Sequence, residues 1–124
     1  MTLSTILVIA LTLWGEARGE SYEGKYAVAQ VIVARHEQSG HSYKKVCLEP
    51  KQFSCWHNGI FTQRMPKGKE PEWVECYSIA DAMVKGQVPP SRATHFRSIK
   101  VRPSWMYAMT RIERIGRHVF YEEN

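Results

Sequence analysis

The start of the chain constrains its fold most, because an apolar run from Thr2 to Leu13 ends abruptly in the segment WGEARGE. The run is too short to span a bilayer as a helix, which takes about 20 residues. It has no positively charged stretch before it and no clear small-x-small cleavage site after it, unlike a secretory signal peptide. We therefore interpret it as a buried first helix, with a signal-like segment that assists export as the alternative.

Four segments combine the apolar spacing, capping residues and stop signals of helices. The ranges expected for them are 4–16, 21–40, 71–86 and 103–116. In the second, Val28, Val31 and Ile32, with the stem of Arg35, form the apolar face. The apolar face of the third consists of Trp73, Tyr77, Ala80, Met83 and Val84, and that of the fourth of Met106, Met109 and Ile112. The fourth begins at Pro103 and stops at Gly116, an asymmetry typical of helices. Arg111, Arg114 and Arg117 would then form a solvated helix face.

Two long segments, 40–70 and 87–103, separate these helices, and HVFY (118–121) reads as a short strand. Loops of such length in a compact domain are usually functional. The sequence thus predicts a mainly α fold, a small single domain over residues 1–124 with long cleft-forming loops and room for a short β-hairpin.

Composition narrows the classes of partner. The net charge of +5 favours polyanions such as nucleic acid, anionic lipid or acidic cell-envelope polymers. Four Trp, six Tyr and four Phe suit either a groove that stacks on flat ligands or a packed core. An odd number of cysteines, Cys47, Cys55 and Cys76, is not a disulfide framework, and whether Cys47 pairs with Cys55 stays open.

Glu16 is the first candidate for chemistry. It lies at the C-terminal end of the first expected helix, where burial and the helix dipole both disfavour ionisation and raise the pKa of a carboxyl. A carboxylic acid that stays protonated near neutral pH is what a glycosidase needs to protonate a leaving-group oxygen. A surface or salt-bridged glutamate is the alternative, and this residue pattern alone does not decide between them.

Several blocks along the chain carry a family resemblance. They are WGEARGE with YEGKYAVAQVIVAR, then CLEPKQFSCW, ECYSIADAMVKGQ, ATHF, PSW and IGRHVFY. In this order they resemble the cell-wall hydrolases related to the SleB and CwlJ spore-cortex lytic enzymes. The resemblance implies a lysozyme-like, mainly helical fold and cleavage of peptidoglycan between N-acetylmuramic acid and N-acetylglucosamine. It implies Glu16 as the catalytic residue and no metal or organic cofactor. Arg92 departs from the family pattern, which usually has Gly there.

The reaction class depends on a second carboxylate. A two-carboxylate glycosidase needs another acid at a defined distance across the bond. Glu20 is the nearest candidate, but it equally suits an anchor for the turn, through Arg18 or backbone N–H groups. If Glu16 works alone, we expect a lytic transglycosylase; a hydrolysing muramidase is the alternative.

The resemblance also suggests substrate contacts. Gln52 and Ser54 are predicted to hydrogen-bond sugar hydroxyl or acetamido groups, and Trp56 either stacks on a sugar ring or packs in the core. Thr94 and His95 are predicted to face Glu16 across the cleft. The full set of expected substrate-binding residues is Glu20, Gln52, Ser54, Trp56, Thr94, His95 and Tyr121; Tyr121, like His118, suits a core role equally.

Three rival interpretations compete with a glycosidase. The first is a cysteine peptidase or amidase with Cys55 as nucleophile and His95 or His118 as base. The second is a nucleic-acid-binding module, although no nucleic-acid motif is present. The third, a zinc site, fails because the cysteines and histidines form no close ligand pair.

We therefore expect an enzyme whose partner is the peptidoglycan glycan strand, with no specific nucleic acid, no stable membrane insertion and a monomeric state. It would act on the bacterial cell wall, from the periplasmic or extracellular side. A bare lytic domain suits a phage endolysin made in the host cytoplasm, with a bacterial autolysin or spore-lytic enzyme as the alternative.

Overall fold

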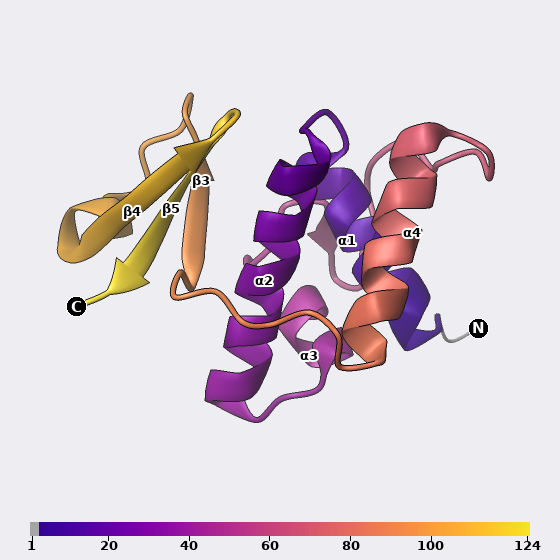
Figure 1. Cartoon of the computed structure of the whole chain (residues 1–124), viewed down its shortest axis with the longest axis horizontal. Helices are drawn as coiled ribbons and strands as arrows, with labels where there is room; N and C mark the ends of the chain where they lie inside the picture. Colours follow the sequence, from indigo (N-terminus) through magenta and orange to yellow (C-terminus); the bar gives the residue numbers. More distant parts are fainter. Residues whose placement is uncertain (1–2) are drawn as a thin grey trace.

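The computed structural model describes residues 3–124 and places the helices beside a small sheet (Figure 1). The first three expected helices are confirmed as α1 (Thr5–Ala17), α2 (Tyr22–Ser39) and α4 (Pro71–Val84). The side chains of Ser4 and Ser21 accept hydrogen bonds at the N-termini of α1 and α2. Gly40 ends α2 with a φ of 73°, in the left-handed region that favours glycine.

The long segment between α2 and α4 is more ordered than its sequence suggested. It contains a short helix, α3 (Tyr43–Leu48), which the sequence analysis missed. It also contains a hairpin of β1 (Trp56–His57) and β2 (Ile60–Phe61), which bears out the expected short hairpin. Asn58 and Gly59 form its turn with φ values of 50° and 78°, as a two-residue hairpin turn requires.

The expectation of a helix over 103–116 is wrong. This segment forms a 3-10 turn, η1 (Ser104–Ala108), and a strand, β4 (Met109–Ile115). A register shift between Arg111 and Glu113 marks a β-bulge. The bulge places partly buried residues at every third position, Met109, Ile112 and Ile115, which imitates helical spacing. The supposed arginine face of a helix is therefore part of a strand and its turn.

Gly116 belongs to a hairpin turn rather than to a helix end. Ile115 pairs with His118, so Gly116 and Arg117 connect β4 to β5 (His118–Glu123). The φ of Gly116 is 59°. The strand predicted at HVFY is confirmed as part of β5, which lies between β4 and β3 (His95–Ser98) in an antiparallel sheet. Its central position explains why residues 118–121 are all buried.

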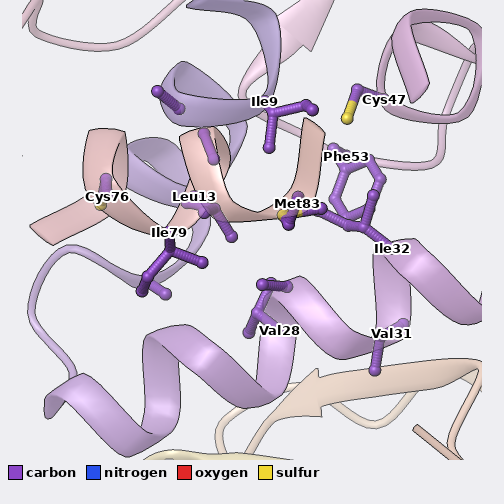
Figure 2. Close-up of a cluster of buried hydrophobic side chains, with 14 of the residues drawn as sticks. Ile9, Leu13, Val28, Val31, Ile32, Cys47, Phe53, Cys76, Ile79 and Met83 are labelled. Carbon is purple, nitrogen blue, oxygen red and sulfur yellow. The ribbon is translucent and has the colours of Figure 1, made fainter. Parts of the chain in front are cut away.

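The main core lies between α1, α2 and α4 (Figure 2). Leu13, Val28 and Ile32 are almost completely buried, and each side chain of this kind stabilises the fold by about 1.5–3 kcal/mol. On α4 the expected burial of Ala80 and Met83 is confirmed, and Cys76 and Ile79 are buried as well. Tyr77 and Val84 are each 45% exposed, because α4 turns a face about one residue away toward α1.

The structure also bears on the disulfide state of the cysteines and on the length of the helices. Cys47, Cys55 and Cys76 are all free and buried, so Cys47 does not pair with Cys55 in this structure. Among the residues that the structure describes, no helix is long and apolar enough to cross a membrane.

Candidate active site

Glu16 lies in the last turn of α1, partly buried against the segment that leads into β1. The preceding residue makes this approach feasible: a Cβ on Gly15 would overlap the side chain of Cys55. Cys55 is completely buried, and its thiol and backbone lie close enough to the Glu16 carboxyl to lower its pKa. The Trp-Gly-Glu sequence thus combines a helix end with a close contact to a second segment.

The surroundings of Glu16 favour the protonated acid. Burial raises the pKa of its carboxyl, and this effect outweighs the lowering by Cys55 and by the positive charge of Arg35. Its place in the last turn of α1, at the negative end of the helix dipole, acts in the same direction as burial. Glu16 therefore has the character that a general acid requires.

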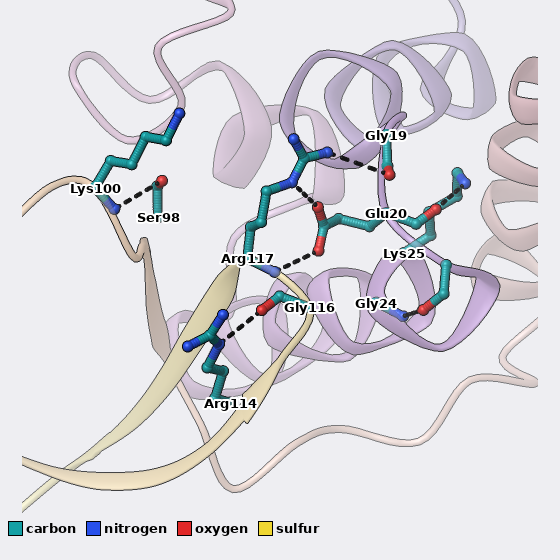
Figure 3. A network of polar contacts seen from close by, with 10 residues as sticks. Gly19, Glu20, Gly24, Lys25, Ser98, Lys100, Arg114, Gly116 and Arg117 are labelled. Carbon is teal, nitrogen blue, oxygen red and sulfur yellow. Dashed lines mark hydrogen bonds and ion pairs between the residues drawn. The ribbon is translucent and has the colours of Figure 1, made fainter.

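Glu20, four residues later, lies in the opposite environment (Figure 3). Its carboxylate accepts hydrogen bonds from the backbone N–H of Arg117 at 2.9 Å and from the Arg117 Nε at 3.0 Å. Desolvation alone would raise the pKa of Glu20, but the hydrogen bonds from Arg117 and the nearby His118 lower it overall. The carboxylate is thus an anchor for the β4–β5 turn, and its partner is Arg117 rather than Arg18.

One hollow of the structure contains Glu16, and a larger one is lined by Arg35 of α2 and does not contain Glu16. The first has a volume of about 280 Å³ and contains Glu16 itself. Its lining residues are Gly15, Glu16, Ala17, Arg18, Gly19, Glu20, Gln63, Ser98, Lys100, Arg117 and His118. The second has a volume of about 370 Å³. Its lining residues are Arg35, Gln38, Ser39, His41, Val46, Glu49, Gln52, Thr94, His95 and Glu123.

Arg35 of α2 connects Glu16 to the larger hollow. Its Nε donates to the carbonyl oxygen of Thr94 at 2.7 Å, and its Nη1 donates to Oε1 of Gln52 at 3.2 Å. Its charge also acts on Glu16. This role was not predicted from the sequence. An arginine on the buried face of α2 could have indicated it, because a buried charge requires partners.

Gln52, Thr94 and His95 all line the larger hollow, whereas Glu16 lies in the smaller one. That Thr94 and His95 face Glu16 across one cleft stays a prediction. The Thr94 hydroxyl lies 2.9 Å from Nδ1 of His95 and donates to Glu123 at 3.3 Å. Burial and the charge of Arg35 lower the pKa of His95, so its ring is neutral near pH 7. Ser54 is exposed and lines neither hollow.

Two of the expected sugar contacts are instead core residues. Trp56 is only 8% exposed, and its indole N–H donates to the Thr12 hydroxyl at 2.9 Å, so neither ring face is open for stacking. Tyr121 is 3% exposed, and its hydroxyl accepts a hydrogen bond from Nε of Arg97 at 2.9 Å. For both residues the sequence left open a role in substrate binding or in the core, and their burial shows that they belong to the core.

The rival peptidase interpretation is wrong. Cys55 is 0% exposed, and burial together with the neighbouring Glu16 raises the pKa of its thiol well above the ordinary range. A nucleophilic cysteine needs an accessible, readily formed thiolate. Over residues 3–124, no cluster of three or more His, Cys, Asp or Glu side chains forms a metal site.

A mainly helical domain in which a buried carboxyl of raised pKa borders a hollow has the architecture expected of an enzyme that cleaves glycans. Residues 19–121 match the family described as Cell Wall Hydrolase, and the chain belongs to this family. The family predicted from the sequence is thereby confirmed.

Relatives and solved structures agree with this assignment. The spore cortex-lytic enzyme of Bacillus subtilis (strain 168) is 32% identical over 121 residues, which are 94% of this chain and 37% of the relative. That of Oceanobacillus iheyensis is 31% identical over 119 residues, 93% of this chain and 40% of the relative. The chain therefore spans about two fifths of the length of these relatives.

The fold matches two solved catalytic domains. The catalytic domain of the germination-specific lytic transglycosylase SleB from Bacillus anthracis superposes with a TM-score of 0.75 at 24% identity, covering 98% of this chain and 97% of that one. The catalytic domain of the Bacillus cereus SleB protein gives a TM-score of 0.72 at 25% identity, covering 95% and 89%. The predicted small, mainly helical fold is thereby confirmed.

Proposed function

We propose that this chain cleaves the glycan strand of peptidoglycan at the bond between N-acetylmuramic acid and N-acetylglucosamine, as a lytic transglycosylase with Glu16 as its catalytic residue. The observation that carries the proposal is the environment of Glu16, whose buried carboxyl has a raised pKa and borders a hollow. Glu20, the other carboxylate of that hollow, is bound by Arg117 and has a lowered pKa.

One carboxyl is sufficient for this reaction. The Glu16 carboxylic acid donates its proton to the glycosidic oxygen, and the bond between that oxygen and C1 of the muramic acid residue breaks. The resulting carboxylate takes the proton of the 6-hydroxyl group of the same sugar, and the oxygen of that group bonds to C1. The product is a 1,6-anhydro sugar. Intramolecular attack removes the need for a second carboxylate that activates water.

The remaining predicted contacts divide into two groups under this proposal. Gln52, Thr94 and His95 line the larger hollow, where they are suited to hold sugar hydroxyl or acetamido groups, and Ser54 would act from the exposed loop beside them. Glu20 supports the site indirectly, by fixing the β4–β5 turn against the end of α1. The relatives' names, as spore cortex-lytic enzymes, support a wall glycan as substrate.

Mass analysis of soluble products from purified peptidoglycan tests the proposal, with the wild type, Glu16→Gln and a control variant, Glu72→Gln. Glu72 is exposed on α4 and lines neither hollow. We expect anhydro-muramic ends from the wild type and from Glu72→Gln, and none from Glu16→Gln. Intact glycan with cleaved peptides, or a fully active Glu16→Gln variant, contradicts the proposal.

A hydrolysing muramidase is the second candidate, and one observation favours it. Glu123 lies in the larger hollow and acts on the same Arg35 that faces Glu16, so a second carboxylate is present on that side. In that case Glu123 would activate a water molecule. Reducing muramic ends, lost in both Glu16→Gln and Glu123→Gln, would identify this reaction.

The setting of the activity follows from the same proposal. We infer that residues 1–124 act as a monomeric catalytic domain on the bacterial cell wall, from the periplasmic or extracellular side. A phage endolysin made in the host cytoplasm fits this, as does a bacterial spore-lytic enzyme. Light scattering of the purified chain tests the monomeric state, since a dimer doubles the mass.

A further inference from the structure

The smaller hollow, which contains Glu16, carries more positive charge than its own carboxylates balance. Three of its lining residues are cationic, namely Arg18, Lys100 and Arg117. Arg117 is paired with Glu20, whose side chain is only 6% exposed. Arg18 and Lys100 have no such carboxylate partner among residues 3–124, and Glu16 is neutral when it acts as an acid.

Two polar atoms of the same hollow lack partners. Among residues 3–124, the Nη1 of Arg18 and the Nδ1 of His118 are buried and have no hydrogen-bond partner. Buried polar groups are usually matched by a protein group, a ligand or water. Arg18 is also held in place, because its guanidinium packs 5.1 Å from the centre of the Trp14 ring.

Lys100 brings its charge from the opposite side. Its backbone N–H donates to the Ser98 hydroxyl at 3.3 Å, which leaves the hydroxyl proton of Ser98 available as a donor. Figure 3 shows the side chains of Lys100 and Arg117 both extending from the sheet side of the site. Donors thus converge on the hollow from the end of α1 and from the segment after β3.

We propose that this hollow binds a carboxylate carried by the muramic acid substituent of the glycan strand, with Arg18 and Lys100 as its charge partners. The inference rests on the proposed function and specifies the substrate: strands with acidic substituents beside the scissile bond are preferred over neutral ones. Two sources supply the same chemistry. One is the free lactyl carboxylate of a strand without peptides, and the other is an acidic residue of the stem peptide.

Binding to soluble strands tests this preference directly. In a Glu16→Gln background, which prevents turnover and mimics the neutral acid, Kd is measured by calorimetry for peptide-bearing strands and for strands freed of peptides by an amidase. Both are measured again after their carboxylates have been converted to amides. We expect amidation to weaken binding about three- to tenfold, the range of a partly exposed, charge-assisted contact. The strand type that shows this loss identifies the source of the carboxylate.

Added substitutions localise the effect. Lys100→Gln is expected to reproduce most of the loss on charged strands and to have no effect on amidated ones, and Arg18→Gln to behave similarly. Lys45→Gln is the matched control, because Lys45 is an exposed lysine of α3 that lines neither hollow. Thermal unfolding verifies that each variant is folded, and Lys100→Gln supplies the test if Arg18→Gln is not.

Equal Kd values for charged and amidated strands of both types overturn the inference. So does a Lys100→Gln variant that is indistinguishable from Lys45→Gln. Because the readout is binding, a failure here is separate from a failure of the proposed function, which would appear as missing anhydro-muramic products from the wild type.

Discussion

Glu16 and Glu20 lie four residues apart in one short motif, yet their surroundings shift the pKa values of the two carboxyls in opposite directions. Glu16 is packed beside the buried thiol of Cys55, and burial raises its pKa. Glu20 is also withdrawn from solvent, but two hydrogen bonds from Arg117 keep it ionised and lower its pKa. Burial raises the pKa of both carboxyls, and the charged guanidinium of Arg117, which bonds directly to Glu20 and not to Glu16, decides which one is an acid and which one an anchor.

Those donors come from distant parts of the chain. Arg117 lies 97 residues after Glu20 and is delivered by the β4–β5 turn. Lys25 secures the same segment from the other side, because its Nζ donates to the backbone oxygen of Glu20 at 2.6 Å and pairs with Glu75 of α4 at 3.0 Å. The loop after Glu16 is therefore held by both the sheet and the helices, which keeps the end of α1 in place.

Neutralising each glutamate in turn tests the difference between the two residues most directly. We expect Glu16→Gln to lower kcat about 10²–10⁴-fold, the usual contribution of a general acid–base residue. Glu20→Gln is expected to retain most of the kcat per folded molecule, because its carboxylate is used in anchoring. Steady-state turnover of soluble glycan strands measures both. Equal losses in the two variants would mean that both carboxylates take part in the chemistry.

Breaking the anchor itself should affect stability rather than chemistry. Gly116 has a φ of 59°, and a Cβ there would overlap the carboxylate of Glu20. Gly40→Ala is the matched control, because Gly40 has a φ of 73° with nothing within 4 Å of the added Cβ. We expect Gly40→Ala to cost about 1 kcal/mol and Gly116→Ala about 2–3 kcal/mol, measured by urea unfolding. Equal costs would show that the Glu20 contact contributes nothing.

The pH dependence of stability should have opposite signs for the two residues. The raised pKa of Glu16 means that the folded state holds this proton more tightly, so its contribution is full below about pH 4.5 and is lost as pH rises through the raised value. The lowered pKa of Glu20 gives a contribution that is present above about pH 4.5 and lost as pH falls through the lowered value.

Unfolding free energies from about pH 3 to pH 8 check both signs. Relative to the wild type, Glu16→Gln should gain stability as pH rises, because an ionised carboxyl is no longer buried. Glu20→Gln should be least stable near neutral pH and approach the wild type in acid. Parallel curves for the two variants would contradict the opposite assignments.

Much of the helical half of the fold was predictable because its signals are local. Ser4, Ser21 and Gly40 mark helix ends by their own side chains and backbone preferences, and the structure uses all three. The segment after Pro103 was not predictable in this way. Its bulge reproduces a three-residue apolar spacing, so periodicity alone indicates a helix, and only pairing with β5 reveals a strand.

The residues of the site also differ in whether local sequence signals could predict them. Glu16 could be singled out because its motif and its place at the end of an apolar helix are both visible in the sequence. Arg35 was noted only for its apolar stem, and Trp56 was as plausible on a sugar as in the core. What decides both cases is packing between segments far apart in the chain, namely the Arg35 bond to the Thr94 carbonyl and the Trp56 bond to Thr12.

The smallest expected effect concerns Cys55, the buried residue beside Glu16. Its thiol lowers the pKa of Glu16 and so partly offsets burial. Cys55→Ala should therefore keep activity within about threefold at the optimum and move the alkaline limb of the pH–rate profile to higher pH. Cys76→Ala, which removes another buried thiol from α4, should leave that limb unchanged. A nucleophilic cysteine would be indispensable, so a loss of activity in Cys55→Ala as large as in Glu16→Gln would favour the peptidase interpretation. A shifted alkaline limb with activity retained would instead identify Cys55 as a neighbour that adjusts the pKa of Glu16.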